Sequence, residues 1–248
     1  MDADRFDAAA LAGVLDQAAQ SRFPLTSLAE LGGVDDRSAY TVQKALIERR
    51  LARGERLIGL KMGFTSEAMR QQMGVARPNC GWLTDAMLVP SGRSLSMGGC
   101  IHPRAEPEVA IRLGRDLGVD ACAAAIEVVD SRFRDYRFTW AENTADNSSA
   151  CGLALGPWRA WPMELADREV RLRVDGECVE RGTTMAVMGH PLKSLTEAVR
   201  LAIELGRPLQ PGMIVLTGGV TAAPYLRPGR RIVAEVDGLD DAVLDVGD

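Results

Sequence analysis

The sequence has few of the residues on which several common catalytic sites depend. It contains only two histidines, His102 and His190, among 248 residues. That number excludes a multi-histidine zinc site and leaves little material for a Ser-His-Asp triad. The five cysteines are scattered, odd in number and without a Cys-x-x-Cys pair, so neither a disulfide framework nor a zinc ribbon is expected. Any chemistry must therefore depend mainly on carboxylates, lysine, backbone amides and a metal ion.

Features that point to nucleic acid, a membrane or an organic cofactor are also missing. The formal charge is −5 and no basic cluster occurs, so nucleic acid is not an expected partner. No apolar run approaches the roughly 20 residues that span a bilayer, and the acidic N-terminus lacks the basic start and apolar core of a secretory signal. Neither a Walker loop nor a dinucleotide fingerprint occurs. We expect a cytoplasmic protein with no membrane partner and no organic cofactor.

The remaining composition, 46% hydrophobic and 25% charged, is that of an ordinary globular protein with one main domain. Helical periodicity over residues 5–20, and again from Asp35 or Asp36 to Gly54, predicts two N-terminal helices. From Leu57 onward, short apolar runs alternate with Gly, Pro, Asn and Asp, which is typical of a sheet-rich domain. We therefore predict an α+β fold, with a helical N-terminal region at 1–55 and a metal-binding catalytic β-domain at 56–248.

Further along the chain, Asp175-Gly176 between two alternating runs predicts a hairpin over residues 170–179. A helix is expected from Leu192 to Leu205, with Gly206 as its C-terminal stop. Two apolar runs, Met213 to Thr217 and Arg231 to Val236, predict strands.

The most informative motif is the pair Glu106 and Glu108. In a strand, residues i and i+2 point to the same side, so both carboxylates project into one space. Glu127, within a second apolar run, is expected to close that space from a neighbouring strand. A glutamate pair alone usually marks a solvated strand face, but these acids are embedded in apolar sequence and need partners. An all-oxygen set of this kind suits magnesium or manganese.

Two other segments carry candidate residues. Lys61, in Ile58-Gly59-Leu60-Lys61-Met62-Gly63, points either outward to solvent or inward to the acids; periodicity alone does not decide. Thr217-Gly218-Gly219 follows an apolar strand, and either forms a simple turn or brings backbone amides close to a ligand. The polar run from Asp146 to Ser149 most simply forms a turn.

Several separated segments together resemble a known family. They occur in the family's order over about residues 10–240, and they are Gly59 to Ser66, Glu106-x-Glu108, Glu127 to Arg132, Ala145 to Ser149, Gly189-His190-Pro191 and Thr217-Gly218-Gly219. The sequence is similar to the 2-keto-4-pentenoate hydratase / 4-oxalocrotonate decarboxylase group of the fumarylacetoacetate hydrolase superfamily.

This resemblance implies a mixed β-sandwich roll and a role in bacterial meta-cleavage degradation of aromatic hydrocarbons. It implies Mg²⁺ or Mn²⁺ held by Glu106, Glu108 and Glu127, with a small 2-oxo acid as substrate. We assign Lys61 and Asp85 as catalytic candidates. The substrate-binding candidates are Asp146, Asn147, Thr217, Gly218 and Gly219. A homo-oligomer is expected, with a hydratase of the same pathway as a plausible associate.

Within the group, the stretch from Thr217 to Ala223 looks decarboxylase-like. Hydratases typically present Pro-Asp-(Phe/Tyr)-Gly, whereas this chain has Pro78-Asn79-Cys80-Gly81, and an asparagine cannot act as a general acid or base. The decarboxylase pattern is not matched there either. The favoured hypothesis is decarboxylation of 2-oxohex-3-enedioate. Hydration of 2-hydroxypenta-2,4-dienoate, with Asp85 or His190 transferring the proton, stays open, as does a non-catalytic metal-binding subunit.

Overall fold

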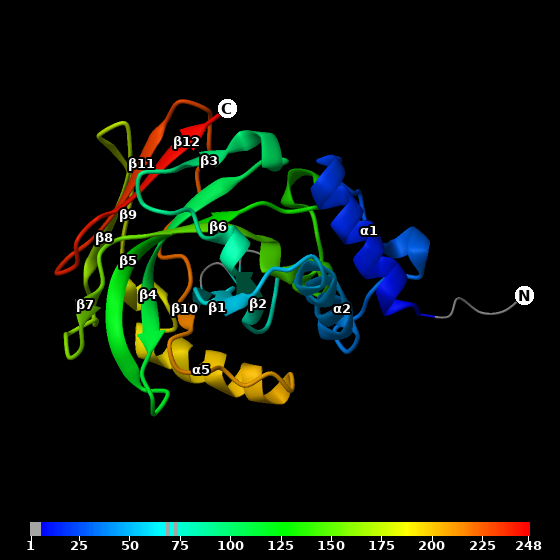
Figure 1. Ribbon diagram of the computed structural model, residues 1–248, viewed down its shortest axis with the longest axis horizontal. Coiled ribbons are helices and arrows are strands. Elements are labelled where there is room, and N and C mark those ends of the chain that lie inside the picture. The colour runs from blue at the N-terminus through cyan, green and yellow to red at the C-terminus, as the bar shows by residue number, and fades with distance from the viewer. Residues whose placement is uncertain (1–5, 68–69, 72–73) are drawn as a thin grey trace, which may run out of the picture.

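The computed structural model describes residues 6–67, 70–71 and 74–248, which form two β-sheets with helices around them (Figure 1). The helices are α1 (Ala8–Ser21), α2 (Ala39–Ala52), α4 (Trp140–Ala145) and α5 (Pro191–Glu204). The strands are β1 (Leu57–Gly63), β2 (Asn79–Thr84), β3 (Ser94–Ser96), β4 (Arg104–Leu113), β5 (Val119–Val129), β6 (Ala150–Leu155), β7 (Arg159–Ala160), β8 (Glu169–Val174), β9 (Glu177–Thr183), β10 (Ile214–Leu216), β11 (Arg231–Val236) and β12 (Ala242–Gly247).

The larger sheet has seven strands in the order β2-β1-β10-β4-β5-β6, with β7 paired to β5. Strands β1 and β10 run parallel, although about 150 residues separate them in sequence, and the other pairs of this sheet are antiparallel. The central pair, β4 and β5, is the longest in the sheet and stays in register from Arg104↔Val129 to Arg112↔Ala121. This long regular ladder fixes which side chains of β4 and β5 share a face.

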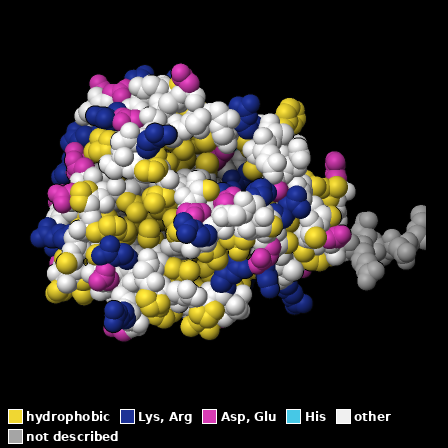
Figure 2. Space-filling view, viewed as in Figure 1, with side chains coloured by type: hydrophobic (Ala, Val, Ile, Leu, Met, Phe, Trp, Pro, Cys, Tyr) yellow, Lys and Arg dark blue, Asp and Glu magenta, His cyan; other side chains and the backbone are white. Residues whose placement is uncertain are grey.

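The smaller sheet has five strands in the order β3-β12-β11-β8-β9 and packs against the larger one. The main core lies between the sheets and beneath α5. Its members include Met62, Val109 and Ile126 from the larger sheet, Leu172 and Leu244 from the smaller sheet, and Leu195 and Ala198 from α5. In Figure 2, apolar side chains gather over β4 and β5, and Lys and Arg side chains follow the edge formed by β8 and β9.

Helices α1 and α2 pack on each other and form a separate small core at one side of the molecule (Figure 1). Asp7 caps α1 by accepting hydrogen bonds from the amides of Ala9 and Ala10. The small core also includes Phe133 and Ala145, which follow β5 and belong to the predicted second domain. The N-terminal helices are therefore attached to the segment that connects β5 to β6.

The α+β class and the mixed sandwich are confirmed. The hairpin forms around Asp175-Gly176, although β9 extends to Thr183, and α5 ends before Gly206, which has a φ of +69°. The predicted start of the second helix is wrong by a few residues. Asp35 instead holds a turn through the backbone and hydroxyl of Ser38, and α2 begins at Ala39. Among the described residues, no helix has the length and apolar character needed to span a bilayer.

Candidate metal centre

Glu106 and Glu127 lie directly opposite each other on β4 and β5. Ala105 and Val109 of β4 point into the core between the sheets, so Glu106 and Glu108 project from the other face. On β5, Ile126 likewise enters that core, which leaves Glu127 on the same side as the other two glutamates. The expected gathering of three carboxylates is therefore what the β4–β5 register produces.

The three carboxylates are close and poorly neutralised. One oxygen from each lies within 4.8 Å of the other two. Glu108 and Glu127 are fully buried, and Glu106 is partly exposed. Glu108 Oε1 and both oxygens of Glu127 accept no hydrogen bond from any described residue. Burial, followed by repulsion from Glu127, raises the pKa of Glu106 to about 7, and the same causes raise the pKa of Glu108 well above its usual value.

Lys61 points inward and reaches the glutamates. Its neighbours Leu60 and Met62 enter the main core, so the alternation of β1 turns Lys61 to the glutamate face. Lys61 Nζ lies 3.1 Å from Glu127 Oε1 as an ion pair, but without the alignment of a hydrogen bond. Burial alone lowers the pKa of Lys61, but attraction from Glu127, Glu106 and Glu108 outweighs it and leaves that pKa raised. Lys61 is therefore a buried cation.

The hydrogen bonds of Lys61 go to Ser148. Its Nζ donates to the carbonyl oxygen of Ser148 at 3.0 Å and to the hydroxyl at 3.3 Å. The Ser148 hydroxyl in turn donates to Asn79 Oδ1, whose amide nitrogen donates to Asn143 Oδ1 and Thr144 Oγ1. This network holds the ammonium in one position.

The turn that carries Ser148 has an unusual backbone. Asn147, Ser148 and Ser149 all have positive φ values of 54°, 52° and 58°. Each such residue costs roughly 1–2 kcal/mol outside glycine. The Asn147 side chain fixes the turn by bonding both the amide and the carbonyl of Trp82. Gly81 permits the approach, because a Cβ there would lie 2.3 Å from the Asn147 carbonyl oxygen. Strain is thus maintained where Lys61 is anchored.

Gly218 and Gly219 lie against the glutamates. The Gly218 amide donates to Glu108 Oε2 at 2.7 Å, so this glycine orients a carboxylate; a substrate-binding role of Gly218 stays a prediction. Gly218 has a φ of +118°, and a Cβ there would lie 2.0 Å from Thr65 Oγ1. A Cβ on Gly219 would lie 2.5 Å from Glu106 Oε2. This geometry favours the second of the two alternatives: the glycines bring the backbone close to the glutamates instead of forming only a simple turn.

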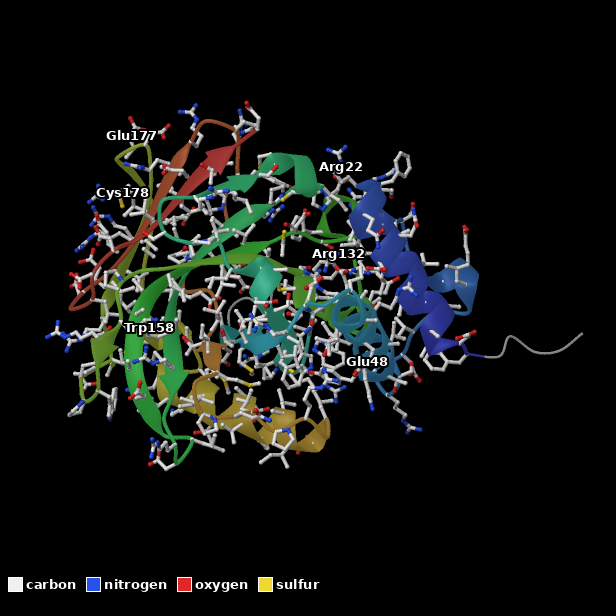
Figure 3. All side chains as sticks on the ribbon, viewed as in Figure 1. Arg22, Glu48, Arg132, Trp158, Glu177 and Cys178 are labelled. Carbon is white, nitrogen blue, oxygen red and sulfur yellow. The ribbon has the colours of Figure 1, made fainter. Side chains whose placement is uncertain are left out.

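Four other predicted site residues have structural partners. Asp85 lies at the Leu57 end of the β1–β2 pair and is bonded to the backbone and guanidinium of Arg56, and its catalytic role stays a prediction. Asp146 is buried and forms an ion pair with Arg132. Figure 3 labels Arg132, which lies between the N-terminal helices and the larger sheet. Asn147 is used entirely by Trp82, and Thr217 Oγ1 donates to the carbonyl of Val109. Each of these side chains therefore has a partner within the protein, and the substrate-binding roles of Asp146, Asn147 and Thr217 stay predictions.

The glutamate cluster fits a hard divalent cation. Three carboxylates face one another with one ammonium beside them, so their charge is not balanced by protein groups alone. Their unpartnered oxygens are the ligand type that Mg²⁺ and Mn²⁺ prefer. A buried carboxylate without a partner is costly, and a bound cation removes that cost.

Comparison with known proteins agrees with this geometry. The profile of the family described as fumarylacetoacetate (FAA) hydrolase C-terminal matches residues 58–246. The chain belongs to this family. A 4-oxalocrotonate decarboxylase from Pseudomonas sp. is 39% identical to this chain, over 91% of this chain and 92% of that protein. A 2-keto-4-pentenoate hydratase from Dechloromonas aromatica (strain RCB) is 35% identical over 83% of each chain.

The structural comparison gives the same group. The 4-oxalocrotonate decarboxylase of Pseudomonas putida G7, complexed with magnesium and adipate, superposes with a TM-score of 0.91 at 30% identity, covering 96% of this chain and 97% of that one. The same enzyme complexed with calcium and acetate gives a TM-score of 0.88. The resemblance deduced from the sequence motifs is confirmed.

Sequence reasoning did not assign a supporting role to Ser148 and Asn79. The sequence alone indicates a turn at Ser148, with little support for a nucleophilic serine, and it marks Asn79 as the residue that replaces a hydratase aspartate. The available signal is the run of polar residues from Asp146 to Ser149 directly before the apolar segment of β6, because such a polar run requires partners when it is buried.

Proposed function

We propose that the chain is a divalent-metal-dependent decarboxylase that converts 2-oxohex-3-enedioate (4-oxalocrotonate) to 2-hydroxypenta-2,4-dienoate and carbon dioxide. The observation that carries the proposal is the buried cluster of Glu106, Glu108 and Glu127 with the Lys61 ammonium beside it. The 39% identical decarboxylase and the superposed decarboxylase with magnesium and adipate support it.

The proposed metal ligands are Glu106, Glu108 and Glu127, and the proposed ion is Mg²⁺ or Mn²⁺. Such an ion, when bound, would act as a Lewis acid towards the carboxylate and 2-oxo group of the substrate. Gly218 supports this set by fixing Glu108 through its amide. Gly219 lets Glu106 lie close to the backbone, because a Cβ at this position would lie 2.5 Å from Glu106 Oε2.

The chemistry requires an electron sink and a cation near it. The bond to the far carboxyl carbon breaks, carbon dioxide leaves, and the electron pair moves through the conjugated double bond to the 2-oxo oxygen. Lys61, kept protonated by the glutamates, stabilises the negative charge that develops there and can return a proton to the product. Ser148 holds the Lys61 ammonium in place.

A direct test is to incubate the purified protein and Mg²⁺ with each substrate separately. Carbon dioxide release from 2-oxohex-3-enedioate, abolished by chelation and by Glu127→Gln, is the expected result. Consumption of 2-hydroxypenta-2,4-dienoate without gas would instead indicate the hydratase.

Hydration of 2-hydroxypenta-2,4-dienoate to 4-hydroxy-2-oxopentanoate is the second candidate, because hydratases from several bacteria are 31–35% identical to this chain. Hydration needs a proton-transfer group near carbon 4. Asn79 carries an amide, Asp85 is paired with Arg56, and His190 caps α5 by accepting a hydrogen bond from the Leu192 amide. These contacts make decarboxylation the better-supported activity.

The two-part division at residues 55 and 56 is also a proposal, and so is a homo-oligomer, with or without a hydratase of the same pathway. Light scattering of the purified chain tests the oligomer, and co-purification with a hydratase of that pathway tests the association. A non-catalytic metal-binding subunit would show metal-dependent stability but no turnover of either substrate.

A further inference from the structure

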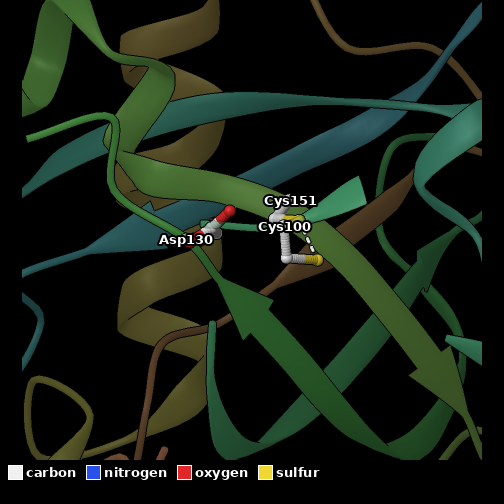
Figure 4. A group of neighbouring side chains, drawn as sticks. All are labelled: Cys100, Asp130 and Cys151. Carbon is white, nitrogen blue, oxygen red and sulfur yellow. Dashed lines mark hydrogen bonds between the residues drawn. The ribbon is translucent and has the colours of Figure 1, made fainter. Parts of the chain in front are cut away.

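A second group of potential metal ligands lies apart from the glutamates. Cys100, which follows the short helix η3 (Met97–Gly99), meets Cys151 at the start of β6, and Asp130 at the end of β5 completes the group (Figure 4). The two sulfur atoms are 3.9 Å apart. Both sulfurs and one Asp130 oxygen lie within 4.8 Å of one another. None of these residues takes part in the function proposed above.

The carboxylate of Asp130 is held in a fixed orientation. One of its oxygens accepts a hydrogen bond from the Ile101 amide and the other from the His102 amide, each at 2.8 Å. Asp130 is buried, Cys100 is nearly so, and Cys151 is partly exposed. The carboxylate therefore has the outer support typical of a metal ligand.

The distance between the two sulfur atoms fits a shared metal ion better than it fits a disulfide bond. Two thiolates at about 2.3 Å from a tetrahedral zinc ion lie roughly 3.8 Å apart. The observed separation is almost the same, so metal binding requires little movement. A disulfide requires about 2.05 Å between the sulfurs, so it requires a larger movement of the two sulfur atoms than metal binding does. The Asp130 carboxylate disfavours the thiolate forms, whereas the Arg132 guanidinium, which donates to the Asp130 carbonyl oxygen, favours them.

We propose that Cys100, Cys151 and Asp130 form a second metal site, selective for a borderline or soft divalent ion such as zinc or cadmium. Thiolate ligands prefer such ions, whereas the three glutamates prefer magnesium or manganese. Binding replaces the two thiol protons, so one M²⁺ enters and up to two H⁺ leave. Water occupies the remaining position. This inference is independent of the proposed decarboxylase activity.

Cadmium is a suitable probe, because its thiolate complexes absorb in the ultraviolet. Protein stripped with a chelator and then saturated with Mg²⁺ is titrated with Cd²⁺. We expect a charge-transfer band that saturates near one equivalent. Cys100→Ser and Cys151→Ser should each abolish the one-equivalent band. Asp130→Asn should retain the band but weaken the affinity at least about tenfold.

Matched controls separate this site from other thiols and from the glutamates. Cys178→Ser, on β9 at the left edge of Figure 3, and Cys122→Ser should keep the full band. Glu127→Gln should keep it too, while losing Mn²⁺ binding. Melting curves recorded in chelator check that each variant folds, and Cys151→Ala serves as a second variant at the partly exposed position. A band that survives both Cys151 variants, or the absence of any band in the unmodified protein, would overturn the proposal.

Discussion

Glu106 and Glu127 face each other across the β4–β5 pair, and repulsion from Glu127 helps to raise the pKa of Glu106. Like charges directly opposite in a sheet are destabilising. Their position is explained if the pair is used to hold a cation, and the predictions below test that use from several directions.

Replacing Glu106 by Gln should weaken Mn²⁺ binding by about 100-fold or more while leaving the fold intact. Loss of a residue that only supports a ligand lowers metal affinity roughly 10–100-fold. Glu106 is a proposed direct ligand, so its loss should lower the affinity at least as much. Isothermal titration measures the affinity, and Glu177→Gln, at the exposed start of β9 (Figure 3), is the matched control. Unchanged Mn²⁺ affinity in the Glu106 variant would remove this residue from the site.

The stability of the metal-free protein should fall as the pH rises from about 4.5 to 7. The pKa of Glu106 is about 7 in the folded protein against an ordinary 4.5, so the folded state binds more protons in this window. Its contribution to stability is therefore fully present below the unfolded pKa and is lost as the pH rises through the folded pKa. Denaturant unfolding in chelator, at several pH values, measures the slope. Glu106→Gln should flatten it, and saturating Mg²⁺ should reverse it.

Lys61→Met should destabilise the metal-free protein by about 3–5 kcal/mol, because it removes the cation that partly neutralises three buried acids. Saturating Mg²⁺ should restore much of that stability. The turnover number should fall by roughly 10²-fold or more, since the group proposed to stabilise charge and transfer a proton is gone. Lys44→Met, at an exposed position of α2, should have no comparable effect. Equal turnover in both variants would exclude Lys61 from catalysis.

Ser148→Ala should have a much smaller effect than Lys61→Met. It removes the hydroxyl bonds to Lys61 and Asn79 but keeps the carbonyl that accepts from Lys61 at 3.0 Å. We expect a loss of about 1 kcal/mol in the free energy of unfolding and less than a tenfold fall in turnover. Denaturant titration and steady-state kinetics check both numbers. A loss as large as that of Lys61→Met would mean that the hydroxyl itself acts on the substrate.

Gly218→Ala should cost both stability and metal affinity. The new Cβ would meet Thr65 Oγ1 at 2.0 Å and displace the amide that holds Glu108. Gly176→Ala is the control, because Gly176 also has a positive φ but no atom within 4 Å of the added Cβ. Gly176→Ala should lower the free energy of unfolding by about 1–2 kcal/mol, because of backbone strain alone, and should leave Mn²⁺ binding unchanged. The Gly218 variant should cost more and bind Mn²⁺ about 10–100-fold more weakly.

The parts of this site that depend on local periodicity could be predicted from the sequence. The i, i+2 spacing of Glu106 and Glu108 fixes their common face, and the Asp175-Gly176 turn fixes a hairpin, whatever the rest of the chain does. The orientation of Lys61 could not be predicted, because it depends on the parallel pairing of β1 with β10 from far along the chain. Periodicity allows both faces, and only the sheet order decides.

Asp85 and Gly218 show a second reason why part of the site could not be predicted. The sequence indicates that Asp85 offers a carboxylate and Gly218 a backbone amide, but it does not indicate which residue each group will bond. Asp85 lies one residue beyond β2, where the nearest cation is Arg56, and Gly218 follows β10, where the nearest acceptor is Glu108. Three consecutive residues with positive φ at Asn147 to Ser149 are equally hidden, because none of them is glycine.

Lys61 Nζ donates to the main-chain carbonyl oxygen of Ser148, and this affects how related sequences should be compared. Substitution at position 148 can change the side chain without deleting the acceptor, provided that the turn keeps its shape. Evolutionary drift at this position would therefore leave the ammonium where it is. The determinants to follow across homologues are instead Gly81 and Asn147, which impose the shape of the turn.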